Sequence, residues 1–151
     1  MNAREIFLAM LRDVMSSESL TETEKQGLSA ATDETWKQVL EMGAMQKVSA
    51  VMFEALKKHP DVAVPAFVRG HLKQCTVQTS VRYYQMISCV REITALLNEQ
   101  GLDYYLLKGV GLSTMYPKEE IRSFGDVDIY IPKKDSCLQW QESFLYAVYC
   151  C

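Results

Sequence analysis

The sequence predicts an α+β fold, in which a helical region over residues 1–100 precedes a partial β core over residues 101–151. Apolar residues recur with helical spacing as far as Gly101. From Leu102 onward the pattern changes to two short apolar runs, "DYYLLKG" and "DVDIYIP", which are typical of strands. Helices followed by strands, without regular alternation between them, are typical of α+β proteins.

The helical region divides into several expected helices. An apolar face marks the first one, and the "TETE" segment at residues 21–24 matches a capping box that begins the second. The apolar pattern over residues 36–56 indicates one helix, or two separated near Gly43. A long helix, unbroken or kinked, is expected from Ala66 to about Gln100, and Gly101 is suited to close it.

The composition excludes several classes of protein. Hydrophobic residues make up 48% of the 151 residues and charged residues 23%, which is typical of a soluble globular protein. No apolar run reaches the roughly 18 residues of a membrane helix, and the N-terminus is a poor signal peptide, so a cytoplasmic location is expected. The net charge of −3 leaves a nucleic-acid partner possible but not favoured. None of the five cysteines forms a C-x-x-C pair, and neither histidine lies at zinc spacing from them.

Two aspartates lie in the second predicted strand, where Asp126 and Asp128 alternate with apolar residues. Because side chains alternate along a strand, both carboxylates are expected on one face, about 7 Å apart. Two unpaired carboxylates are costly to bury, and a divalent cation removes that cost. The pattern therefore fits an open Mg²⁺ or Mn²⁺ site that receives a nucleotide. The alternative is that both side chains are solvated or paired with Arg122 and lysines.

A glycine turn precedes this strand. In "LLKGVG", Gly109 ends the first predicted strand and opens a short helix, so that a phosphate can approach the backbone beside Lys108. A glycine in a tight turn between a strand and a helix needs no ligand, and that structural interpretation stays open as well. Together, the turn and the two aspartates form the two halves of an expected site for a metal-bound nucleotide.

The segment "LLKGVGLSTMYPKEEIRSFGDVDIYI", residues 106–131, resembles the uncharacterised nucleotidyltransferase family of the DNA-polymerase-beta-like superfamily. The shared elements are L-K-G, a short helix with Y-P, and R-x-x-G-D-hydrophobic-D-hydrophobic. The helical leader with its Trp36 is also similar, so the resemblance extends over roughly the first 135 residues. It implies a mixed sheet flanked by helices, of which this chain contains the start.

The resemblance implies a metal-dependent enzyme that transfers a nucleoside monophosphate from an NTP, such as ATP, to an unidentified hydroxyl acceptor. Asp126 and Asp128 match its two catalytic, metal-binding acids, and Gly109 with Val110 matches the nucleotide-phosphate turn. The remaining matched positions are cofactor-binding candidates: Lys108, Arg122 and Gly125. Arg122 is expected to bind the triphosphate or orient the aspartates, or else to form a structural ion pair.

The sequence departs from the superfamily pattern in two places. Val110 follows Gly109 where the superfamily carries glycine or serine, and Ser113 is expected to be a helix-surface hydroxyl. The superfamily uses a third carboxylate on a later strand, and neither Asp135 nor Glu142 lies in a predicted strand. Residues 133–151 are instead consistent with a helix.

Only two strands can be identified, and two strands alone are marginally stable. We therefore expect a fragment or truncated product that binds a metal-bound nucleotide weakly and turns over poorly or not at all. Its last dozen or so residues are expected not to be native to the fold.

Two other functions fit parts of the sequence. A glycosyltransferase also holds a metal and a sugar nucleotide with D-x-D, but it does not account for the L-K-G turn. A non-catalytic helical interaction module with a degenerate nucleotidyltransferase remnant would account for the missing acid. An exposed sheet edge would also promote self-association in that case.

Overall fold

The computed structural model describes residues 1–132 and the backbone of residues 144–148. Four helices form the N-terminal part: α1 (Ala3–Met15), α2 (Glu22–Ser29), α3 (Asp33–Met45) and α4 (Ser49–Lys58). A single long helix, α5 (Ala66–Glu99), connects this part to the rest of the chain. It is followed by β1 (Tyr105–Leu107), α6 (Gly109–Ser113), the 3-10 helix η1 (Glu119–Ile121), β2 (Val127–Ile131) and β3 (Phe144–Val148).

The helix boundaries follow local sequence signals. The predicted capping box is confirmed, because Thr21 caps α2 and the Glu24 side chain returns to the Thr21 backbone. Of the two alternatives left open for residues 36–56, the two-helix one holds: α3 ends at Met45, α4 begins at Ser49, and Lys47 between them has φ of 56°. Helix α5 is unbroken, about 50 Å long at 1.5 Å per residue, and Gly101 follows it with φ of 63°.

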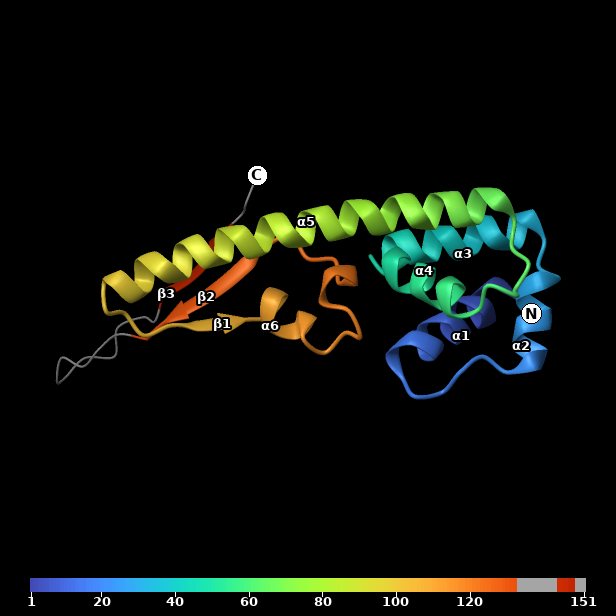
Figure 1. Ribbon diagram of the computed structural model, residues 1–151, viewed down its shortest axis with the longest axis horizontal. Helices are drawn as coiled ribbons and strands as arrows, with labels where there is room; N and C mark the ends of the chain where they lie inside the picture. The colour runs from blue at the N-terminus through green and yellow to red at the C-terminus, as the bar shows by residue number, and fades with distance from the viewer. Residues whose placement is uncertain (133–143, 149–151) are drawn as a thin grey trace.

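Two hydrophobic cores lie along α5, one at each half of the helix (Figure 1). In the first core, Trp36 packs with residues of α1, α4 and the start of α5 such as Leu72. In the second core, the later half of α5 covers one face of the sheet. The residues of this second core are Tyr83, Met86, Val90, Phe124, Val127 and Ile129. Since α5 belongs to both cores, the predicted division at residues 100 and 101 stays a prediction.

The sheet has the order β1-β2-β3, and both pairings are antiparallel. The α+β class is therefore confirmed, with mainly helical content and a small sheet. The predicted helix is wrong over Phe144–Val148, which pairs with β2 along its whole length. Local spacing suggested a helix, but this apolar and aromatic segment also suits a strand, and pairing satisfies the backbone groups on the second edge of β2. The prediction of only two strands fails for the same reason.

The other predictions for the C-terminus, a helix over the rest of residues 133–151 and a non-native last dozen residues, fall largely outside the described residues. None of the helices in the described part of the chain combines the length and the apolar character that a membrane span requires.

Candidate functional site

The two aspartates lie at the start of β2, on the central strand of the sheet. Val127 and Ile129 point into the second core, as alternation predicts, which places Asp128 on the opposite face. Asp126 precedes the strand by one residue and is half-buried. Asp128 is only 5% exposed, and its Oδ2 atom is buried without a hydrogen-bond partner. A buried carboxylate oxygen in this state is energetically costly, so its position requires an explanation.

Lys108 supplies the nearest positive charge that the structure shows for Asp128. Its Nζ atom lies 3.8 Å from Asp128 Oδ2, which is an ion pair but too long for a hydrogen bond. The Lys108 side chain is 74% exposed, so water screens most of the attraction. The lysine therefore compensates the buried carboxylate only weakly.

The glycine turn lies directly against the aspartate segment. A Cβ atom built on Gly109 would lie 2.9 Å from the backbone oxygen of Asp126, closer than real Cβ contacts allow. Only glycine fits there, because the turn lies against the backbone of the aspartate segment. The approach of a phosphate to the same turn stays a prediction. The preceding Lys108 has φ of 41° and ψ of −131°, a conformation that costs a non-glycine residue of order 1–3 kcal/mol.

Arg122 holds the turn in place. Its Nη1 atom donates a hydrogen bond to the carbonyl oxygen of Gly109 at 2.5 Å. Its guanidinium also lies 6.0 Å from the ring centre of Tyr116 and 5.7 Å from that of Phe124, within cation–π range. Arg122 thus joins the turn to the chain that leads into β2. From this position it can orient the turn relative to the aspartates.

The other predicted residues surround the junction between the glycine turn (Lys108–Gly109) and the segment that leads into β2 (Arg122–Asp126). Val110 packs against the second core, and its carbonyl accepts a hydrogen bond from Ser113 Oγ at 2.6 Å. Ser113 is completely buried, so its prediction as a surface hydroxyl was wrong. Gly125 lies next to the long helix, because a Cβ built there would be 3.4 Å from Arg82 Nη2. The structure thus brings all of the predicted site residues to one end of the sheet.

The loop between α6 and β2 is anchored to the helical region by residues that sequence reasoning missed. Lys118 Nζ donates a 2.6 Å hydrogen bond to Glu54 on α4, and Tyr83 on α5 donates one of 2.5 Å to Glu119. Burial, and then the hydrogen bond to Glu119, raises the pKa of Tyr83 to about 12. These partners are far apart in sequence, and no local pattern marks Glu54 as different from other helical glutamates.

Burial by itself would raise the pKa of Glu54, but the hydrogen bonds from Lys118 and Lys57 outweigh it and hold the pKa below its usual value. The same contact raises the pKa of Lys118. The ion pair is therefore present at neutral pH, and it connects the helical region to the loop that carries Arg122.

The donor set at this site is a pair of carboxylates. Among the described residues, no group of three or more His, Cys, Asp or Glu side chains could hold a metal ion. Asp126 and Asp128 nevertheless suit a hard cation that takes few protein ligands and keeps water or phosphate in its other positions. The unpartnered Asp128 Oδ2 is the observation in favour of such a cation.

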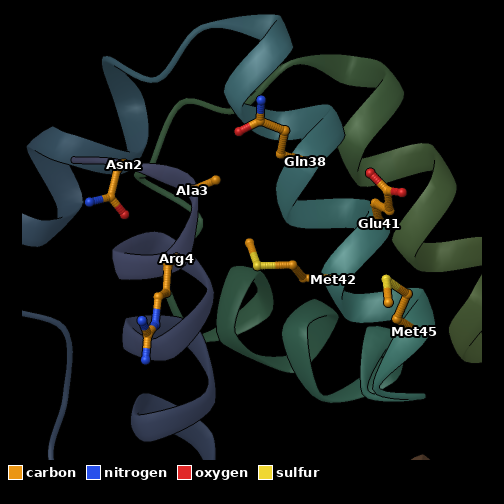
Figure 2. A pocket seen from close by; sticks show the side chains of 7 residues that line it. All are labelled: Asn2, Ala3, Arg4, Gln38, Glu41, Met42 and Met45. Carbon is orange, nitrogen blue, oxygen red and sulfur yellow. The ribbon is translucent and has the colours of Figure 1, made fainter.

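A cavity lies at the other end of the molecule, between α1 and α3 (Figure 2). It measures about 510 Å³ and is open to solvent. Asn2 on its wall is already used, because it caps α1 by accepting a hydrogen bond from the Glu5 backbone. Its other lining residues are Ala3, Arg4, Gln38, Glu41, Met42 and Met45, which bring together no pair of like-charged or metal-binding groups. We therefore place the candidate site at the aspartates.

Comparison with known families agrees with this choice. The model of a family described as uncharacterised nucleotidyltransferase matches residues 32–146, which include the turn and both aspartates. The chain belongs to the uncharacterised nucleotidyltransferase family. No curated protein and no solved structure matches the chain. Membership of the uncharacterised nucleotidyltransferase family supports a nucleotidyltransferase-like function and leaves substrate and metal to be argued from the site.

Proposed function

We propose that this protein binds a nucleoside triphosphate together with Mg²⁺ or Mn²⁺ at Asp126 and Asp128, and transfers the nucleoside monophosphate to a hydroxyl acceptor. The buried, unpartnered Oδ2 of Asp128 carries the proposal. A carboxylate kept in this state destabilises the fold unless a cation completes it. Family membership supplies the reaction class.

In this proposal each residue of the junction has a separate task. Asp126 and Asp128 hold the cation. Gly109 lets the turn lie close to Asp126, and Lys108 presents an exposed ammonium that can meet a phosphate. Arg122 acts through the Gly109 carbonyl and positions the turn. When bound, a divalent cation neutralises charge on the triphosphate and on the departing pyrophosphate.

The distance between Lys108 and Asp128 favours a cation site at Asp128 over a structural ion pair between these two residues. A structural ion pair would place a lysine within hydrogen-bonding distance of Asp128, whereas Lys108 stays at 3.8 Å and is largely solvated. The completely buried Asp13 also has an Oδ2 without a hydrogen-bond partner, but its Oδ1 is hydrogen-bonded to the Leu20 backbone N–H and to His59. Glu54, in contrast with Asp128, is paired tightly with Lys118 at 2.6 Å. Compared with Glu54, Asp128 is weakly compensated, which is the state expected of a group that awaits a ligand.

Calorimetric titration of Mg²⁺-ATP and Mn²⁺-ATP into the protein tests the proposal, with Asp126→Asn as the variant and Asp61→Asn as the control. Asp61 is an exposed aspartate in the loop after α4, at the helical end of the molecule. We expect metal-dependent binding that Asp126→Asn abolishes and Asp61→Asn preserves. Equal binding by all three proteins would refute the site.

A transfer assay with an NTP labelled on the α-phosphate, supplied with candidate hydroxyl acceptors, then tests the reaction. Competition by a UDP-sugar that displaces ATP would instead favour a glycosyltransferase. Metal-nucleotide binding without transfer to any acceptor would favour a module that binds without catalysing.

A further inference from the structure

The two faces of the sheet differ in what covers them. Helix α5 packs on the face that carries Val127 and Ile129 (Figure 1). By alternation, the opposite face of β2 carries Asp128 and Tyr130. The neighbouring strand adds Tyr105 to this face, because Tyr105 is the direct cross-strand partner of Tyr130. The candidate metal-binding aspartate and two tyrosines therefore share one face of the sheet.

The two tyrosines form an aromatic pair. Their ring centroids are 6.1 Å apart and the ring planes are tilted by 35°, so the rings lie beside each other and are not edge-on. Tyr105, the first residue of β1, is 60% exposed. An exposed aromatic surface of this kind can stack against a planar group, since aromatic faces attract other π-systems.

This face of the sheet changes in character along its length. The Tyr105–Tyr130 pair is followed, two residues along each strand or about 7 Å away, by the Leu107–Asp128 pair. The turn with Lys108 comes next. One end of the surface is thus aromatic, and the other carries the carboxylate and the exposed ammonium. A nucleoside triphosphate has the same polarity, with a planar base at one end and an anionic triphosphate at the other.

We propose that Tyr105 and Tyr130 form a stacking shelf for the base of the bound nucleoside triphosphate. This inference rests on the proposed function, since it takes Asp128 as the position of the cation and phosphates. Stacking reads the face of a base rather than its edge, so the shelf accepts any of the four bases. The protein should therefore bind ATP, GTP, CTP and UTP with affinities within about tenfold of one another.

The test compares Mg²⁺-ATP with Mg²⁺-tripolyphosphate, which has the phosphates but no base. Tyr105→Ala should weaken ATP binding about tenfold, the scale of one base–aromatic stacking contact, and leave tripolyphosphate binding unchanged. Tyr105→Phe keeps the ring and should bind ATP within about twofold of the unmodified protein. The matched control is Tyr84→Ala, because Tyr84 is 62% exposed but lies on α5. It should change neither affinity.

Each outcome decides the inference. If Tyr105→Ala binds ATP as tightly as the unmodified protein, while Asp128→Asn abolishes that binding, the shelf is wrong and the proposed function stands. Equal weakening of ATP and tripolyphosphate by Tyr105→Ala means that the strand was disturbed, and also overturns the shelf. If the unmodified protein binds neither probe, both the shelf and the proposed function fail.

Discussion

Replacing Asp128 by asparagine gives opposite results for stability and for ligand binding if the site is correct. The change removes a negative charge whose Oδ2 is buried without a hydrogen-bond partner, and it hardly changes the volume of the side chain. An unsatisfied buried polar group costs about 1–3 kcal/mol and a charged one costs more, so the neutral amide of asparagine removes the part of the cost that is due to the charge. The exposed Lys108, 3.8 Å away, returns at most about 1 kcal/mol of this. We expect Asp128→Asn to stabilise the metal-free protein by about 1–2 kcal/mol.

For a chain of this length, 1 kcal/mol corresponds to about 2–4 °C in melting temperature, so the expected rise is about 2–8 °C. The assay is thermal unfolding followed by circular dichroism in a chelator, repeated with excess Mn²⁺ and ATP. The unmodified protein should gain stability from Mn²⁺-ATP by mass action, and Asp128→Asn should gain none. A metal-free Asp128→Asn that melts lower, combined with an unchanged response to Mn²⁺-ATP, would refute the reasoning and make Asp128 a structural residue.

Three further predictions concern the turn and its anchors. Gly109→Ala should cost about 1–3 kcal/mol in urea unfolding and weaken Mg²⁺-ATP binding, because its Cβ would meet a backbone oxygen at 2.9 Å. Gly111→Ala is the control, since its Cβ would make an ordinary 3.6 Å contact, and equal effects of the two changes would contradict the account. Arg122→Lys should lower ATP affinity about tenfold, because lysine cannot reproduce the planar contacts of the guanidinium. A titration in which Arg122→Lys keeps full ATP affinity would exclude a positioning role for Arg122. The pKa of Glu54 is lowered in the folded state, so its pair with Lys118 should stabilise the fold fully at pH values above the ordinary carboxyl pKa. This stabilisation should be lost as the pH falls through the lowered pKa. Glu54→Gln should flatten this acid limb of a melting-temperature profile, and an unchanged limb would rule the pair out as its cause.

Local sequence signals predicted most of the helical region. The capping box at Thr21, the closing glycine at Gly101 and the strand over residues 127–131 are all present, because each depends on neighbours within a few residues. The placement of Val127 and Ile129 in a core followed from alternation alone. The aspartate pair and the glycine turn were also found from the sequence, since their spacing is a property of one strand and one turn.

Contacts between distant residues could not be predicted in the same way. The third strand was read as a helix, because its stability comes from pairing with β2 and its local spacing is ambiguous. Lys118 and Glu54 are 64 residues apart, and neither has a local pattern that indicates a partner. The contact between Gly109 and the Asp126 backbone depends on how the turn packs on the strand, which only the tertiary fold determines.

The central claim is that Asp126 and Asp128 together hold a divalent cation for a nucleotide. Electron paramagnetic resonance of Mn²⁺ measures this directly, because the signal of free Mn²⁺ decreases when the ion is bound. With ATP absent and then present, the unmodified protein should remove Mn²⁺ from the free pool more than the double variant Asp126→Asn, Asp128→Asn does. Identical free Mn²⁺ signals for the two proteins, with and without ATP, would contradict the account.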